Sequence, residues 1–233
     1  MRKFVFRLLA LLLAALMCYS AYRLWDINRD YRAEADMHRM VLDYKPPPQE
    51  DQSVVNQSVI DLQAKYPDVA GWLTVPGTEI DYPFVWYEDN DFYLRRDLNG
   101  DYALAGTLFM DFRCARDFTA QNTIIYGHHM RNGSMFGTLK HFADRAFFDE
   151  RRSGTIFLPE ATLRLEFFAF LVVDHADEEI YSVWRNDSYL DYVRRQARQY
   201  REIGLTDEDK IVTLSTCAYE FDNARMVLLA RVR

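Results

Sequence analysis

Cysteine is scarce in this chain. Its 233 residues include only Cys18, Cys114 and Cys217, and the first of these lies in an apolar N-terminal run. One disulfide is therefore conceivable in the rest of the chain, between Cys114 and Cys217. A chain with so few cysteines is not a disulfide-stapled scaffold. Because 49% of its residues are apolar, the chain can bury a sizeable hydrophobic core instead. A free thiol in such a chain is then a candidate functional group.

Short motifs that mark several enzyme classes are also missing. The sequence has no glycine-rich phosphate loop and no GxSxG elbow. His128, His129, His141 and Cys217 are numerous enough to bind a metal ion, but their spacing matches no zinc pattern such as CxxC, HExxH or HxH. We therefore expect no metal site.

Positive charge is in deficit over most of the chain. Residues 1–25 contain four Lys and Arg and no acid, which leaves 24 Lys and Arg against 35 Asp and Glu in the remainder. Binding to nucleic acid needs clustered cations that contact phosphates. We therefore expect no nucleic-acid partner.

A basic N-terminus precedes an apolar run. Arg2, Lys3 and Arg7 come before residues 8–22, which are uncharged and rich in Leu and Ala. This order is typical of export signals. Because the positive-inside rule keeps such cations in the cytoplasm, the domain that follows is expected outside the cell.

The apolar run has three interpretations: a cleaved signal peptide, a lipoprotein signal ending at Cys18, or an uncleaved anchor. No A-x-A cleavage site follows the run, and the large residues Leu16 and Met17 precede Cys18. We therefore favour an uncleaved anchor, with residues 1–25 as a cytoplasmic tip and single membrane span.

The rest of the chain separates into a linker and a domain. Residues 26–52 have helical composition until Pro46, Pro47 and Pro48, which predicts a helical stalk and a Pro-rich linker. Residues 53–233 predict one mostly-β domain of the α+β class, because short β-branched and aromatic runs alternate with turn residues. The expected helices are residues 53–65, 135–142 and 188–203, and the expected strands include residues 107–110, 123–126, 155–158, 162–173, 210–216 and 225–232.

Cys217 ends a predicted strand, and Arg225 begins the next one. If the two strands form a hairpin, both residues lie near the same end of the sheet. A guanidinium there would lower the pKa of the thiol and could donate hydrogen bonds to an oxyanion. The alternatives are a buried structural cysteine and an exposed surface arginine.

His128 follows a predicted strand and Gly127, in a loop that is rich in Asn and Ser. A cysteine nucleophile needs a partner that exchanges protons near neutral pH, and histidine is suited to this role. A purely structural or surface histidine is the alternative.

Three segments together resemble the signature of class B sortases. They are TLSTC at residues 213–217, an arginine eight residues later, and NTIIYGHHMRNGSMFG at residues 122–137. The stretch at residues 90–111 and the helix expected at residues 188–203 resemble the same class. His129 stands where many relatives have Asn, and the motif places the catalytic role on His128.

This resemblance, which covers about residues 55–232, implies a closed β-barrel of about eight strands with N-terminal helices and a helix before the cysteine strand. It implies transpeptidation without a cofactor. Cys217 is the nucleophile, His128 protonates the leaving amine, and Arg225 stabilises the oxyanion. The substrates are secreted proteins with a C-terminal sorting motif, of the NPxTN or (S/N)PxTG kind, and the acceptor is a peptidoglycan amine or a pilin lysine.

The resemblance also implies which residues line the groove for the sorting peptide: Asn90, Leu94, Tyr126, Ser215 and Thr216. Core packing is the alternative for Leu94 and Tyr126. The rival functions are a hydrolytic cysteine peptidase, a sortase of another class, and a membrane-tethered β-domain that binds a ligand without catalysis.

Overall fold

The computed structural model describes residues 2–48, 53–217 and 223–233, except the side chain of Cys217. Two compact units divide the chain, Met1–Met40 and Val41–Arg233. The first consists of helix α1 (Arg2–Leu42), which continues for two residues into the second. Within the described residues, α1 is a helix long and apolar enough to cross a membrane.

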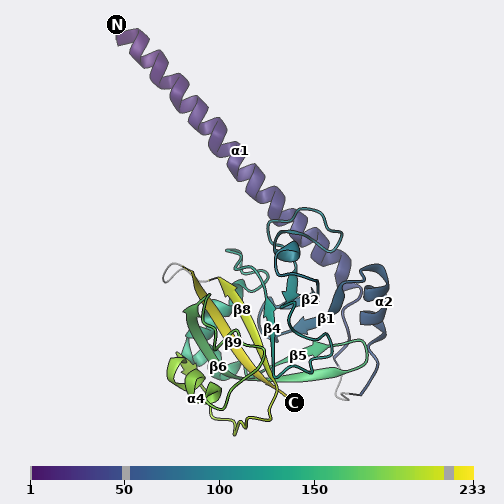
Figure 1. The fold of residues 1–233 in the computed structure, drawn as a ribbon. Helices are drawn as coiled ribbons and strands as arrows, with labels where there is room; N and C mark the ends of the chain where they lie inside the picture. Colours follow the sequence, from purple (N-terminus) through teal and green to yellow (C-terminus); the bar gives the residue numbers. More distant parts are fainter. Residues whose placement is uncertain (1, 49–52, 218–222) are drawn as a thin grey trace. The chain divides into compact units, whose positions relative to one another are not determined.

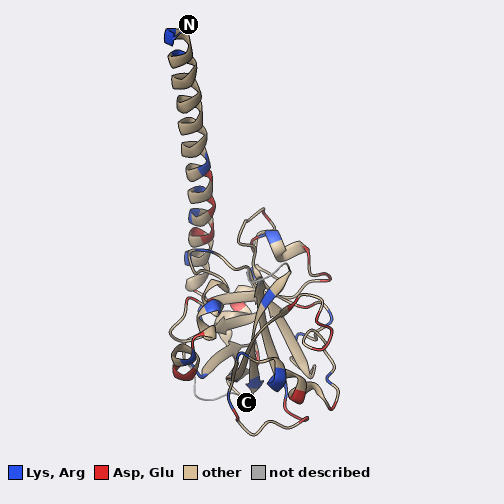
Figure 2. Cartoon of the chain, turned by 90° about the vertical axis from the view of Figure 1, so that its left-hand side faces the viewer, with Lys and Arg blue, Asp and Glu red and all other residues tan. Residues whose placement is uncertain are grey.

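Charge divides α1 into two parts along its length. Its first half is apolar apart from a basic tip, and its second half carries both acids and bases (Figure 2). Ion pairs one turn apart, such as Arg29 with Asp26 at 2.9 Å, stabilise the charged half as a helix in water. The helix ends at Leu42, a few residues before the proline run that begins at Pro46.

The second unit is a closed β-barrel, as expected. Its strands pair in the order β5-β1-β2-β3-β4-β8-β9-β6, and β5 also pairs with β6, which closes the ring (Figure 1). The eight strands are β1 (Val69–Thr74), β2 (Asp81–Val85), β3 (Leu108–Met110), β4 (Asn122–Tyr126), β5 (Ser153–Phe157), β6 (Thr162–Asp174), β8 (Ile211–Cys217) and β9 (Ala224–Val232).

Strand β6 is the longest and holds the barrel together. One of its edges pairs with β9. Residues 162–166 of β6 also pair with β5, and Ala169 and Phe170 pair with the short β7 (Gln199–Tyr200). The register with β9 shifts between Phe167 and Ala169, and such a bulge lets a strand bend between its partners. The side chains of residues 167–171 are fully buried, so this strand supplies much of the core.

The predicted helix at residues 188–203 is wrong in its second half. Helix α4 (Tyr189–Gln196) ends where the chain becomes extended and forms β7. The reason is tertiary: the backbone N–H groups of Arg198 and Arg201 donate to carbonyls of β6, and the ring of Tyr200 packs edge-on against Phe168. Sheet pairing here overrides the helical composition.

The other expected helices are shifted. Helix α2 (Gln57–Lys65) begins four residues later than residue 53. Residues 135–142 do not form one helix, because Met135 has a left-handed φ of 52°. Instead, 3-10 helix η2 (Gly137–Ala143) leads to α3 (Arg145–Glu150), and another 3-10 helix, η1 (Phe92–Arg95), precedes β3.

Asn56 ties α2 to the barrel. Its side-chain nitrogen lies within hydrogen-bond distance of the Leu158 carbonyl at 2.6 Å, the Ala161 carbonyl at 3.0 Å and the Thr162 hydroxyl at 3.1 Å. Because Asn56 is 1% exposed, water cannot replace these bonds.

We expect Asn56→Ala to lower the free energy of unfolding by about 3 kcal/mol, because several buried acceptors lose their donor. The matched control is the next residue, Gln57, which is exposed and whose side chain bonds to Asp61 on its own helix. Gln57→Ala should cost about 0.3 kcal/mol. Urea unfolding of both variants measures the difference, and equal losses would contradict the assignment of Asn56 as the anchor of α2.

Candidate functional site

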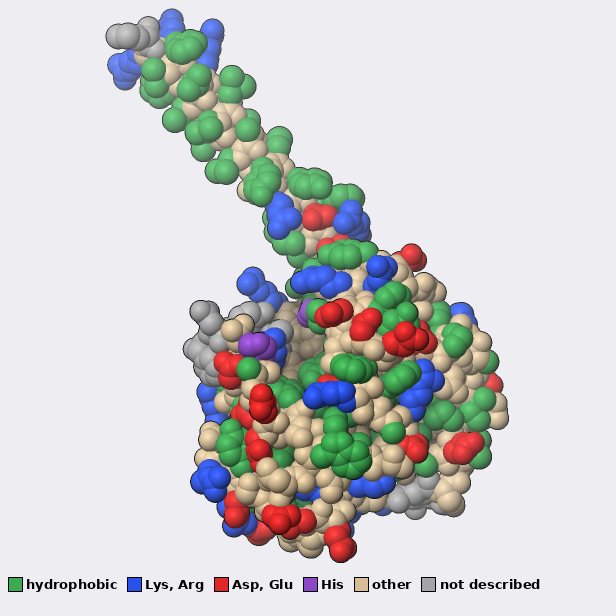
Figure 3. Space-filling model, viewed as in Figure 1, with side chains coloured by type: hydrophobic (Ala, Val, Ile, Leu, Met, Phe, Trp, Pro, Cys, Tyr) green, Lys and Arg blue, Asp and Glu red, His purple; other side chains and the backbone are tan. Residues whose placement is uncertain are grey.

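A pocket of about 1020 Å³ opens at the rim of the barrel where β4 and β8 end. Its walls include seven of the eight residues singled out from the sequence: Asn90, Leu94, Tyr126, His128, Ser215, Thr216 and Arg225. The face shown in Figure 3 is hollowed, with histidine side chains (purple) near the edge of the hollow. The eighth residue, Cys217, directly follows Thr216 in β8.

Strands β8 and β9 form the predicted antiparallel pair. The register places Cys217 opposite Arg225, so the backbones of the two residues are direct neighbours across the sheet. The Arg225 side chain is turned so that Nη1 donates to the carbonyls of Asn223 (3.3 Å) and Ala224 (3.0 Å). These two bonds hold the guanidinium at the start of β9, where Arg225 lines the pocket.

His128 lies directly beyond the end of β4, on the same rim. β4 and β8 are parallel, with Tyr126 opposite Ser215, and the N–H of Gly127 donates to the Ser215 carbonyl at 3.1 Å. A Cβ atom on Gly127 would approach Leu108 Cδ2 to 2.4 Å and the Phe136 ring to 2.8 Å, so a larger residue where the chain leaves the strand would force these buried side chains to shift. His128 therefore enters the pocket next to the end of β8.

The main-chain carbonyl of Leu94 is the hydrogen-bond partner of the His128 ring, at 2.6 Å from Nε2. Because a carbonyl only accepts, Nε2 carries the proton and Nδ1 of the neutral ring is left as the basic nitrogen. The pKa of His128 lies below its ordinary value, mainly because the ring is buried. The hydrogen bond to Leu94 raises the pKa, whereas the positive charge of Arg95 lowers it further. The ring thus binds a proton less readily than a histidine in water.

The loop that carries the two histidines folds back on itself. The carbonyl of His128 accepts from Phe136 N at 3.0 Å, and His129 forms a β-bridge with Met135. Of the two histidines, His128 lines the pocket, and it is the one to which the motif assigns the catalytic role. A Cβ atom on Gly137 would approach the Met130 carbonyl to 2.3 Å, so this tight return depends on glycine.

Helix η1 brings Leu94 to the ring of His128. Leu94 is 40% exposed, so the alternative of simple core packing is wrong for it. Gly106 lies directly beneath, because a Cβ atom there would approach the Leu94 carbonyl oxygen to 2.5 Å. The preceding residue is also fixed: the Tyr93 hydroxyl donates to Asp68 at 2.7 Å, and burial together with this bond raises the pKa of Tyr93. The helix that carries the acceptor of the His128 bond is therefore anchored at the neighbouring residue.

A buried carboxylate organises another wall of the pocket. Asp111 is fully buried and accepts hydrogen bonds from Arg113 (2.8 and 2.7 Å), from the Tyr126 hydroxyl (3.0 Å) and from Asn90 Nδ2 (3.3 Å). Burial would raise the pKa of Asp111, but the bonds and charge of Arg113 outweigh it and lower the pKa. Burial and the same carboxylate raise the pKa of Tyr126, so its hydroxyl stays a donor.

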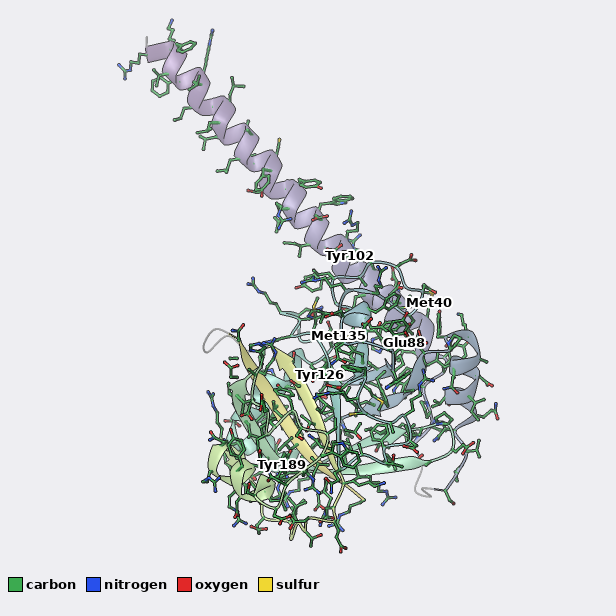
Figure 4. The ribbon with its side chains drawn as sticks, viewed as in Figure 1. Met40, Glu88, Tyr102, Tyr126, Met135 and Tyr189 are labelled. Carbon is green, nitrogen blue, oxygen red and sulfur yellow. The ribbon has the colours of Figure 1, made fainter. Side chains whose placement is uncertain are left out.

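Tyr181 completes the wall beside β8. Its hydroxyl lies 2.8 Å from Ser215 Oγ, and its ring stacks against Tyr126, which is labelled in Figure 4, at a centroid distance of 6.2 Å. Sequence reasoning missed Tyr181, Asp111 and Arg113. Asp111 does end the stretch at residues 90–111 that carried the resemblance, whereas the loop containing Tyr181 has no motif that marks it.

Cys114 is a structural thiol. It is 2% exposed, and its sulfur lies 3.6 Å from the Asn122 carbonyl and 3.5 Å from the N–H of Ile124. Burial raises the pKa of the Cys114 thiol to about 11, so it is protonated at neutral pH and a poor nucleophile.

We expect Arg95→Gln to raise the pKa of His128, because it removes a positive charge that disfavours the imidazolium. Arg96→Gln is the matched control: the Arg96 guanidinium bonds to the Gly100 carbonyl and packs over Phe92, and its charge does not contribute to the shift. NMR titration of the His128 ring protons measures both variants. A shift in neither variant, or the same shift in both, would rule out the effect of Arg95.

Comparison with known proteins agrees with the geometry. No protein-family model matches the chain. The curated Sortase B of Listeria monocytogenes is 33% identical over 184 residues, which are 76% of this chain and 75% of that protein. The crystal structure of sortase B from Bacillus anthracis superposes with a TM-score of 0.75 at 32% identity, over 88% of this chain and 98% of that one.

A further solved structure is a Streptococcus pyogenes class B sortase involved in pilus biogenesis. It matches with a TM-score of 0.70 at 33% identity, over 75% of this chain and 97% of that one. The sequence identity to the curated relative, the share of both chains that it covers and the closed barrel with its helices all point to the same family. The chain belongs to the sortase B family, the cysteine transpeptidases of cell-wall anchoring.

Proposed function

We propose that this enzyme is tethered to the membrane by α1, cleaves a C-terminal sorting motif after its threonine, and joins the new acyl group to a cell-wall amine. The observation that carries the proposal is the gathering of His128, Arg225 and the groove residues around one pocket, with Cys217 paired to Arg225 in the sheet.

The reaction has two acyl transfers. The Cys217 thiolate attacks the threonine carbonyl carbon, the C–N bond breaks, and His128 gives a proton to the departing amine. An acceptor amine then attacks the thioester and loses a proton to His128, and the C–S bond breaks to release the Cys217 thiolate. Because Nε2 is bonded to the Leu94 carbonyl, Nδ1 is the nitrogen that exchanges the proton.

Arg225 stabilises the negative charge that develops on the threonine oxygen. Its Nη1 is held by two main-chain carbonyls, and within the described part of the chain this leaves Nε and Nη2 to donate to substrate. A preorganised donor of this kind contributes about 3 kcal/mol to the transition state. Because His128 has a lowered pKa, the pair of thiolate and imidazolium is scarce at neutral pH, and turnover is slow.

Asn90, Leu94, Tyr126, Ser215 and Thr216 form the groove for the sorting peptide, of the NPxTN or (S/N)PxTG kind. Leu94 offers an exposed apolar side chain to the peptide. The Thr216 hydroxyl is buried, lines the pocket and has no hydrogen-bond partner among the residues that the structure describes. A peptide backbone that enters the groove supplies the partner that this hydroxyl lacks.

The acceptor is a peptidoglycan cross-bridge amine. A pilin lysine is the second candidate, and it is favoured by the similarity to the Streptococcus pyogenes class B sortase involved in pilus biogenesis. Both acceptors are primary amines, so the same chemistry serves either one.

Helix α1 is a single-pass signal anchor with a cytoplasmic N-terminus and an extracellular catalytic domain. The basic tip of the helix and the apolar half that follows support this orientation. A substrate held at the membrane during export meets a tethered enzyme at a higher effective concentration than a free one.

We expect mass spectrometry to detect a thioester on Cys217 when the enzyme meets NPQTN or SPKTG peptides. The mass should correspond to the peptide cut after threonine, and Cys217→Ala should abolish both adduct and cleavage. Cys114→Ala is the matched control and should keep the adduct, because that thiol is buried and protonated.

Adding a primary amine tells a transpeptidase from a hydrolase. Ligated product supports transpeptidation, whereas cleavage with release of only the free acid would make the enzyme a cysteine peptidase. A folded wild type that forms no adduct and cleaves no sorting peptide would contradict both and favour the ligand-binding domain.

Fusing alkaline phosphatase to the C-terminus tests the topology. We expect phosphatase activity in cells with the fusion, because that reporter is active only outside the cytoplasm, and we expect the full-length protein in the membrane fraction. Activity from a cytoplasmic reporter would contradict the orientation, and a shortened soluble protein would show that α1 is cleaved.

A further inference from the structure

Residues 180–183 contribute Tyr181 and Ser182 to the pocket wall, and the barrel holds the segment by its main chain. The four consecutive carbonyls of this segment each accept a hydrogen bond from the barrel. The donors, in order from residue 180 to 183, are Asn122 Nδ2 (3.1 Å), Arg113 Nη2 (3.0 Å), Asn122 Nδ2 (2.9 Å) and the Asn122 backbone nitrogen (3.2 Å). Two residues thus hold the whole segment.

Both donors are themselves fixed. Asn122 is fully buried at the start of β4, where its pairing with Ile211 of β8 and its burial fix its position, and its Oδ1 accepts a further bond from the Thr213 hydroxyl at 2.7 Å. Arg113 is oriented by the two bonds that its guanidinium makes to Asp111. The donors therefore face residues 180–183 before any ligand binds.

The held segment places Tyr181 against the end of β8. The Tyr181 hydroxyl reaches Ser215, two residues before Cys217, and its ring packs on Tyr126. We propose that Asn122 and Arg113 are positioning residues, which keep residues 180–183 as a preformed wall of the peptide groove. This inference rests on the proposed function, since that function makes the pocket a peptide groove.

A wall held in this way acts on binding more than on chemistry. A loop that must become ordered when the peptide binds costs conformational entropy at that moment, whereas a wall held by the barrel has already lost that entropy on folding. Neither Asn122 nor Arg113 is among the residues that exchange protons or stabilise charge in the proposed reaction. Loosening the wall should therefore raise KM and leave kcat nearly unchanged.

Asn122→Asp tests the inference in the full chain, because it keeps the size of the side chain and replaces the NH₂ donor with oxygen. We expect about a tenfold rise in KM for a sorting peptide, a kcat within about twofold of wild type, and about tenfold faster hydrogen exchange at the amides of residues 180–183. Thr213→Val is the matched control. It removes the other bond of the same amide, and both KM and exchange should stay within about twofold of wild type.

An unchanged KM and unchanged exchange in Asn122→Asp would overturn the proposal, and so would equal changes in Thr213→Val. Should Asn122→Asp fail to fold, Arg113→Lys decides, since lysine keeps a cation beside Asp111 but lacks the fork that reaches Tyr181. The same changes there support the proposal, and their absence overturns it. If the wild type cleaves no sorting peptide, the proposed function fails, while hydrogen exchange still decides whether the wall is held.

Discussion

The parallel pairing of β4 with β8 is the constraint on which the site depends. Two parallel strands finish at the same edge of a sheet, so the chain leaves β4 toward His128 beside the place where β8 reaches Cys217. Antiparallel β9 then begins at that edge and brings Arg225 opposite Cys217. His128 is therefore brought to the same rim as Cys217 and Arg225, which lie far from it in the sequence, without a long loop to position it.

The charged and ionisable side chains around this rim bond mainly to neutral main-chain groups, or to an oppositely charged side chain nearby. His128 bonds to a main-chain carbonyl, and Arg225 bonds to two others. The buried acid, Asp111, is paired with Arg113 on its own turn. The carbonyl of Leu94 orients the ring of His128 and does not carry the full charge that would stabilise an imidazolium. A site built in this way favours the neutral form of the His128 ring.

Much of this could be predicted from the sequence because the signals are local. Strands β4 and β8 are rich in β-branched residues and β9 is an apolar run. Gly127 beyond β4, Cys217 at the end of β8 and Arg225 at the start of β9 mark one rim. The second half of the helix expected at residues 188–203 is β7, because the exposed edge of β6 attracts it, and composition does not reveal such a distant partner. Tyr181 and Arg113 were missed for a similar reason: their positions follow from hydrogen bonds that span 34 and 68 residues of sequence.

The place of β9 between β8 and β6 has a consequence for how the chain reaches its folded state. β9 is the last strand in chain order, yet it fills the gap between two strands that begin about 15 and 60 residues earlier, and most pairings in the barrel are non-local. Until that strand is in place, β6 and β8 each keep an unpaired edge. Closure of the barrel and arrival of Arg225 at the rim are therefore one event, so a folding chain in which β9 has not yet paired has neither a closed barrel nor an assembled site.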